Sequence, residues 1–101
     1  MTHNDLTPAE VEALTLLGEE CAEVIQAVTK ILRHGPDSFD PRDRAKGSNR
    51  EQLEREVGQV FASVRILRQN FELDMESVKR EEGNKMRNVK PYLHYAKVRA
   101  R

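Results

Sequence analysis

The side chains most able to carry out chemistry are acidic, and they occur in two pairs at helical spacing. Glu20 and Glu23 are three positions apart, as are Glu56 and Gln59 farther along the chain. Residues three apart are neighbours on one helix face. Each pair borders a stripe of apolar residues, so we expect both pairs at the edge of a helix interface. Two carboxylates there repel each other and lose hydration unless a cation such as Mg²⁺, which accepts oxygen ligands, joins them.

Spacing alone leaves two interpretations of these pairs open. Acidic pairs usually belong to a solvated helix face, and 17 of the 101 residues are Asp or Glu. The alternative is a metal site, which is favoured by the matching position of the second pair beside its own apolar stripe. If the two helices pack antiparallel, three carboxylates and one amide converge. An iron-binding bundle is not indicated, because the Glu-x-x-His repeats that it needs do not occur in the chain.

The first pair lies on a long helix with a clear beginning and end. Thr7 and Glu10 form a capping box around Pro8, which suits the first helical position, and Gly35-Pro36 ends the helix. The apolar stripe of this helix comprises Val11, Leu14, Leu17, Cys21, Val24, Val28 and Ile31. The single cysteine is therefore predicted to be a buried thiol, and it excludes an internal disulfide.

The second pair lies on another long helix, which follows a polar loop over residues 35–48. Ser48 or Asn49 caps this helix, with Gln52 as the capping-box partner of Asn49. The stripe of the second helix comprises Leu53, Val57, Val60, Val64, Leu67 and Phe71. Both stripes repeat at steps of three and four residues, as antiparallel helix packing requires.

The remainder of the chain is also predicted to be helical. A third helix begins after Asp74, and Pro91 starts a short final helix that bears Tyr92, Tyr95 and Val98. Because no segment alternates like a strand, the pattern predicts an all-α antiparallel helical bundle. A chain of 101 residues is expected to form one domain, residues 1–101. With only 38% hydrophobic residues, such helices are expected to complete their burial as a homodimer or homotetramer.

Composition also narrows the partners and the location. Basic and acidic residues balance at 17 each, so the formal net charge is zero and a general nucleic-acid binder is not indicated. A basic C-terminal stretch is the exception. It could bind phosphates, but a solvated helix end explains it equally well. No apolar stretch is long enough to cross a bilayer, and the N-terminus lacks a signal-peptide pattern. We therefore expect a soluble, cytoplasmic protein with no membrane or nucleic-acid partner.

Three segments occur in an informative order: Leu17–Ala27 (LGEECAEVIQA), Lys30–Gly35 (KILRHG) and Asn49–Gly58 (NREQLEREVG). In this order they resemble the signatures of MazG-like, all-α nucleoside triphosphate pyrophosphohydrolases. The middle segment is similar to the Lys-x-x-Arg-aromatic-Gly of compact, phage-type members. The resemblance covers roughly residues 10 to 95. It implies the antiparallel helical fold of that family, completed by oligomerisation.

The resemblance also implies a metal site, with Mg²⁺ as the expected ion and Mn²⁺ as the alternative. Glu20 and Glu23 match two ligands of the family, and Glu56 matches a third that could instead be the base for the attacking water. The fourth family ligand is an aspartate, where this chain has Gln59. An amide oxygen can still bind a hard cation, but it adds no negative charge, so metal affinity is expected to drop. Either Glu19 or Glu82 substitutes for the missing carboxylate, or activity is impaired.

The implied reaction splits a (deoxy)nucleoside triphosphate, such as (d)GTP or a non-standard nucleotide, into a monophosphate and pyrophosphate. Lys30, Arg33 and Lys85 are candidates for binding the phosphates, and Asn84 for binding base or sugar. The groove between the helices and the loop over residues 35–48 are expected to recognise the base. The alternative is a catalytically impaired MazG-like oligomer that binds nucleotide or a partner protein. A nucleic-acid-binding, antitoxin-like module would rest only on the basic C-terminal stretch.

Overall fold

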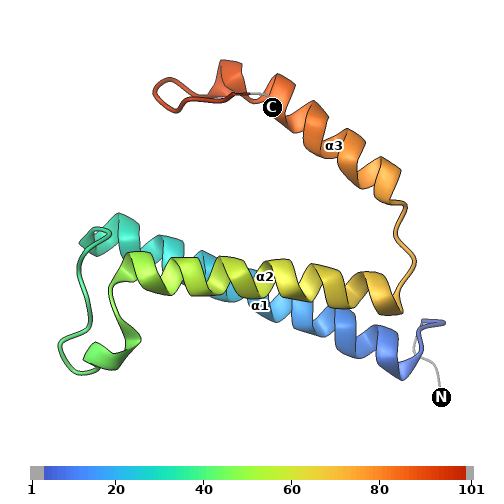
Figure 1. The fold of residues 1–101 in the computed structure, drawn as a ribbon, viewed down its shortest axis with the longest axis horizontal. Coiled ribbons are helices and arrows are strands. Elements are labelled where there is room, and N and C mark those ends of the chain that lie inside the picture. The colour runs from blue at the N-terminus through green and yellow to red at the C-terminus, as the bar shows by residue number, and fades with distance from the viewer. Residues whose placement is uncertain (1–3, 100–101) are drawn as a thin grey trace. The chain divides into compact units, whose positions relative to one another are not determined.

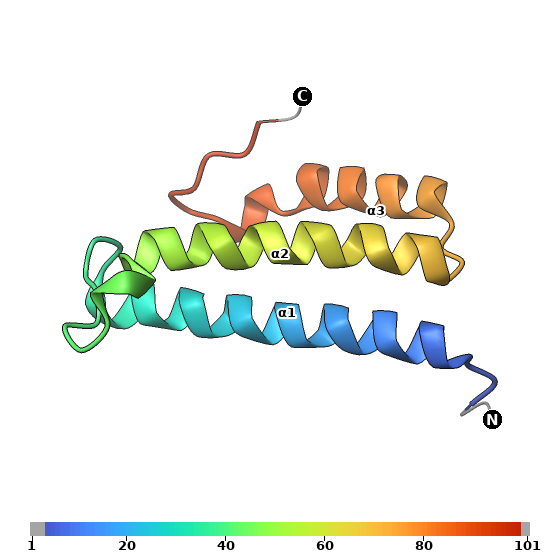
Figure 2. The ribbon, with the colours of Figure 1, turned by 60° about the horizontal axis from the view of Figure 1, so that its bottom comes forward.

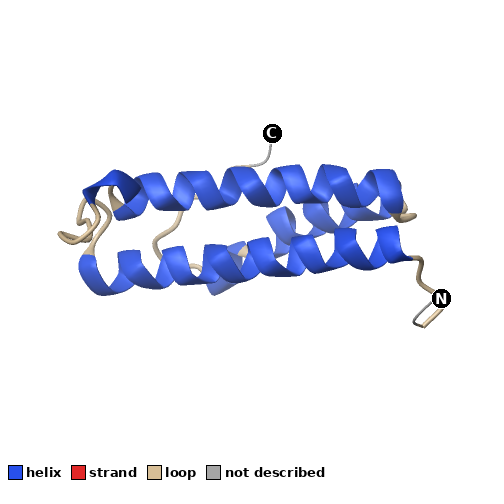
Figure 3. Ribbon diagram, turned by 90° about the horizontal axis from the view of Figure 1, so that it is seen from below, coloured by secondary structure: helices blue, strands red, loops and turns tan. Residues whose placement is uncertain are grey.

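A computed structural model describes residues 4–99, and these residues are helical wherever they are regular (Figure 3). The elements in chain order are α1 (Pro8–His34), the 3₁₀ turn η1 (Arg44–Lys46), α2 (Asn49–Asn70), α3 (Met75–Asn88) and the 3₁₀ turn η2 (Lys90–Tyr92). Between residues 4 and 99 the extended pairing amounts to an isolated bridge from Phe39 to Ser48. The predicted all-α class is therefore confirmed. No helix in this part of the chain is both long and apolar enough to span a membrane.

The chain divides into two compact units, Met1–Phe71 and Glu72–Arg101, and each is described by itself. The first unit is a hairpin in which α1 and α2 run antiparallel, side by side along their length (Figures 1 and 2). A hairpin of this kind brings together residues whose numbers add to a constant. Glu20 of α1 therefore comes opposite Glu56 and Gln59 of α2.

Capping boxes define where both hairpin helices begin. The box predicted for α1 is confirmed: Thr7 Oγ1 accepts from the Glu10 N–H, and Glu10 Oε1 accepts from the Thr7 N–H at 2.8 Å. At α2 the cap is Ser48 and its partner is Glu51, so the predicted pairing of Asn49 with Gln52 is wrong. The Ser48 N–H donates to Glu51 and lowers the pKa of that carboxyl.

Asn49 and Gln52 instead close the loop between the two helices. The buried Asn49 side chain donates to the Gly35 carbonyl at 3.0 Å, and Gln52 Nε2 donates to the Gly47 carbonyl at 3.3 Å. Both glycines have positive φ, +89° at Gly35 and +79° at Gly47, which a residue with a side chain rarely adopts. These contacts join the end of α1 to the start of α2. The loop is therefore held against the ends of α1 and α2 by hydrogen bonds.

The α1–α2 interface overlaps only in part with the stripe of α1 that the sequence predicts: Leu17, Val24 and Ile31 are half-buried, whereas several other members of that stripe are exposed. Ala13 and Ala27 are buried, and Ser63 of α2 is only 1% exposed, whereas Cys21 is exposed. The predicted buried thiol is thus wrong. Small side chains on the stripe through Ala13 and Ala27 allow the helix axes to approach closely, and this stripe also includes the half-buried Glu20.

In the second unit, the predicted cap of α3 is confirmed, because Asp74 accepts from the backbone N–H groups of Glu76 and Ser77. The predicted final helix after Pro91 is wrong. Only the three-residue turn η2 forms there, and Leu93 is already extended, with φ −117° and ψ 126°. A short helix is marginal unless one face packs against another element, and here Tyr92 and Tyr95 are 81% and 98% exposed.

Candidate functional site

The antiparallel register of the hairpin brings Glu20 of α1 together with Glu56 and Gln59 of α2. The Gln59 side-chain amide lies 2.9 Å from Glu20 Oε2 and 3.1 Å from Glu56 Oε2. Both carboxylates are half-buried at the interface, and Gln59 lies at its exposed margin. We refer to these three residues as the carboxylate–amide cluster. Three of the four predicted metal ligands thus converge.

The Gln59 amide can serve this cluster in two orientations. With its nitrogen toward the carboxylates, it donates hydrogen bonds to both Glu20 and Glu56, which offsets their mutual repulsion. Which way a glutamine amide points is assigned from its partners. Rotation by 180° places the carbonyl oxygen at the same point, so that three oxygens face one another. Three converging oxygens without a donor suit a hard divalent cation.

Glu23, the fourth predicted ligand, is exposed one turn farther along α1 and makes no hydrogen bond or ion pair with the described residues. Within residues 4–99, no three Asp, Glu, His or Cys side chains gather closely enough to hold a metal ion. Glu19 is likewise exposed. The donor set that fits a cation here is therefore two carboxylates with one amide oxygen, a set of lower charge than four carboxylates.

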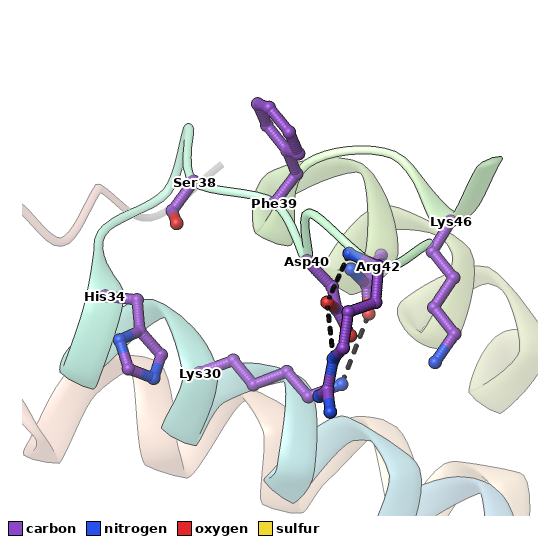
Figure 4. A pocket seen from close by; sticks show the side chains of 8 residues that line it. Lys30, His34, Ser38, Phe39, Asp40, Arg42 and Lys46 are labelled. Atoms are coloured by element: carbon purple, nitrogen blue, oxygen red, sulfur yellow. Dashed lines mark hydrogen bonds and ion pairs between the residues drawn. The ribbon is translucent and has the colours of Figure 1, made fainter. Parts of the chain in front are cut away.

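A pocket of about 330 Å³ opens where the loop over residues 35–48 folds against the end of α1 (Figure 4). We call it the loop pocket. Its lining comprises Lys30, His34, Ser38, Phe39, Asp40, Arg42, Lys46 and Gln52. Of the two predicted phosphate-binding residues on α1, Lys30 lines this pocket, with its Nζ 3.4 Å from Gln52 Oε1. Arg33 is exposed and does not line it.

Sequence reasoning missed the loop cations that complete this pocket. Arg42 forms an ion pair with Asp40 at 3.2 Å, and Lys46 lies in the η1 turn. A usable signal exists in the sequence, since Arg42, Arg44 and Lys46 alternate along a short loop. That signal does not reveal which of them point toward α1. Arg44 instead stacks over the Phe39 ring, 4.7 Å from its centroid.

The other two predicted substrate-binding residues, Asn84 and Lys85, lie on α3 in the second unit. Asn84 Nδ2 donates to Glu81 Oε1 at 3.5 Å, and Asn84 Oδ1 accepts from Arg87. Lys85 is exposed near the C-terminal end of the helix, where its positive charge interacts favourably with the helix dipole. Their roles toward a nucleotide stay predictions.

The first unit is thus an all-α antiparallel hairpin in which Glu20 of one helix faces Glu56 and Gln59 of the other. The family model of the MazG nucleotide pyrophosphohydrolase domain matches residues 10–94. This span covers most of the chain, so the protein belongs to the MazG nucleotide pyrophosphohydrolase family. Neither a curated protein nor a solved structure gives a match. The predicted family is thus confirmed, and nucleotide pyrophosphohydrolysis is the activity of the class.

Proposed function

We propose that this protein is a divalent-metal-dependent enzyme that hydrolyses a (deoxy)nucleoside triphosphate to the monophosphate and pyrophosphate. The observation that carries the proposal is the convergence of Glu20, Glu56 and Gln59 across the hairpin, inside the span that matches the family. The cluster is at the margin of the interface, where a substrate in solution can reach it. A nucleotide substrate also favours the cytoplasm, where nucleotides are made and used.

In this proposal the converging Glu20, Glu56 and Gln59 would hold Mg²⁺ or Mn²⁺, and the exposed Glu23 one turn away on α1 would supply a further carboxylate. When bound, such an ion neutralises phosphate charge and lowers the pKa of a coordinated water. Glu20 and Glu56 keep their positions because they are anchored on opposite helices, and the Gln59 amide spans the gap between them. Glu56 accepts the proton of the attacking water if it does not serve as a ligand. Cationic side chains would hold the phosphates and stabilise their charge.

The direct test is to incubate the purified protein with each (deoxy)nucleoside triphosphate and Mg²⁺ or Mn²⁺, and to separate the products. We expect monophosphate and pyrophosphate in equal amounts, with a clear preference among bases, and no turnover after addition of EDTA. Release of orthophosphate and a diphosphate instead would contradict the proposed bond cleavage. Reaction in ¹⁸O-labelled water identifies the phosphorus that is attacked.

We further propose that a homodimer or homotetramer forms through a second stripe of α1. This outer stripe repeats at steps of three and four and comprises Val11, Leu14, Gly18, Cys21, Ile25, Val28 and Leu32. The hairpin leaves all of it but Leu14 exposed, with Ile25 66% and Leu32 81% exposed. A row of apolar and small residues at this spacing fits a facing helix. With only three apolar residues fully buried among those described, the hairpin gains most from such a partner.

Changing Ile25→Glu is expected to dissociate this oligomer, because it places a charge in the middle of the outer stripe. Light scattering coupled to gel filtration should give a mass above 11.6 kDa for the wild type and a monomer mass for the variant. Gln26→Glu adds the same charge one position away, off the stripe, and should leave the oligomer intact. A wild-type monomer, or an unchanged Ile25→Glu oligomer, would exclude this interface.

A catalytically impaired relative that binds nucleotide or a partner protein is the second candidate. Gln59 favours it, because the amide satisfies both carboxylates without a metal ion. Wild-type protein that binds nucleoside triphosphates without cleaving them, together with recovered turnover in Gln59→Asp, would establish this alternative.

A further inference from the structure

The loop pocket gathers positive charge from two segments that are separate in sequence. Lys30 comes from α1, while Arg42 and Lys46 come from the loop and its η1 turn (Figure 4). Asp40 is the one carboxylate among the lining residues described. Three cations less one carboxylate leave a net charge of +2, with His34 neutral. The volume of about 330 Å³ lies within the range of small-ligand sites.

Among the described lining residues, the ion pair joins Arg42 to Asp40 and leaves the charges of Lys30 and Lys46 uncompensated. Asp40 is engaged by Arg42, whose backbone N–H also donates to it at 2.9 Å and lowers the pKa of the Asp40 carboxyl. Over residues 4–99, neither Lys30 nor Lys46 has a carboxylate within 4.0 Å. The Lys30 ammonium contacts the neutral Gln52 oxygen instead. Cations that share a small cavity repel one another unless an anion joins them.

The loop pocket lies beside the α1–α2 interface, at the end of the hairpin where the loop joins the two helices. The carboxylate–amide cluster lies farther along the same interface. Gln52, which contacts Lys30, precedes Glu56 by one turn of α2, about 6 Å along the axis. Lys30 follows Glu20 of the cluster by ten residues of α1, about 15 Å along the axis, but its ammonium lies at Gln52, nearer the cluster. A charged chain held at the cluster can therefore extend into the pocket.

We propose that the loop pocket binds the β- and γ-phosphates of the substrate, the part that leaves as pyrophosphate, through Lys30, Arg42 and Lys46. This inference rests on the proposed function and changes the expected role of the loop from base recognition to phosphate binding. Ammonium and guanidinium groups are suited to phosphate oxygens. Arg44 already covers one face of the Phe39 ring, so the aromatic side chain of the loop offers a base at most its other face. Positive charge in the loop pocket would stabilise the pyrophosphate as it leaves.

The test measures the binding of inorganic pyrophosphate to the full chain by calorimetry, in EDTA and at 0.15 M salt, so that neither metal nor turnover contributes. Arg42→Gln/Lys46→Gln is expected to weaken binding about tenfold for each cation removed, since each makes a charge-assisted contact. Lys46→Gln alone keeps the Asp40–Arg42 pair and should weaken binding about tenfold. Arg65→Gln, on α2 outside the pocket, controls for net charge and should leave binding unchanged.

Other outcomes separate this inference from the proposed function. If pyrophosphate binds the double variant as tightly as the wild type, the pocket is not a phosphate site, whatever the enzyme assay gives. The same conclusion follows if the variants weaken the binding of a nucleoside monophosphate but not that of pyrophosphate, because the pocket would then hold the nucleoside. If the variants bind pyrophosphate more weakly while the wild type cleaves no nucleoside triphosphate, the loop pocket is a phosphate site and the proposed reaction is wrong.

Discussion

Glu20→Ala and Glu56→Ala are each expected to lower kcat/KM for nucleoside triphosphate hydrolysis by roughly 100-fold or more. Each change removes one of only two carboxylates in the carboxylate–amide cluster, and thus half of the negative charge available to a divalent cation there. Steady-state kinetics at several Mg²⁺ concentrations measures the effect. If these residues bind the ion, the concentration of Mg²⁺ needed for half-maximal rate rises as well.

Glu54→Ala is the matched control for this experiment. Glu54 is exposed on α2, two residues before Glu56, and makes no contact with the cluster. Its loss changes net charge by the same amount and should leave kcat/KM within about twofold. Thermal unfolding of all variants shows whether each is folded. Unchanged kinetics in both cluster variants would mean that the hydrolytic site lies elsewhere.

Gln59→Asp is expected to tighten Mn²⁺ binding about tenfold, because a full negative charge near the ion contributes on the order of 1 kcal/mol even at the dielectric constant of water. In the metal-free protein the same change removes the two N–H donors between Glu20 and Glu56 and adds a third carboxylate. We expect a loss of about 1–3 kcal/mol in the free energy of unfolding. Mn²⁺ should restore this stability by its binding.

The measurements are Mn²⁺ titration and thermal unfolding with and without the ion. Gln59→Ala separates the two effects, since it removes the donors but adds no charge. It should lower metal-free stability without any gain in Mn²⁺ affinity. Equal Mn²⁺ affinity of Gln59→Asp and the wild type would show that residue 59 is not a ligand position, and the carboxylate–amide cluster would then have only a structural role.

The local features of the fold were predictable because they depend on neighbours in the sequence. The capping box of Thr7 and Glu10, the end of α1 before Gly35 and the Asp74 cap of α3 are all decided within four residues. The α2 cap was predicted within one residue. Its partner was misassigned because Asn49 and Gln52 resemble a capping box as closely as Ser48 and Glu51 do, and only the contact of Asn49 with Gly35 distinguishes them.

The packing of α1 could be predicted only in part, because the helix carries two stripes that differ by about a third of a turn. The stripe through Leu14, Cys21 and Val28 is more apolar, but the stripe through Ala13 and Ala27 faces α2. Apolar character is visible in the sequence. Close approach of two helices depends on small side chains on both partners, and that match is a property of the pair.

The amino-acid sequence by itself thus determined the all-α class, both ends of α1, the start of α3, the family and the acidic pairs that are candidates for its chemistry. Only the tertiary structure decided that Gln59 lies between Glu20 and Glu56, and that a loop of mixed charge closes a cationic pocket around Lys30. The physical reason is register. Helix periodicity fixes which residues share a face, whereas the antiparallel packing of two helices and the glycine turns of the loop fix which faces meet.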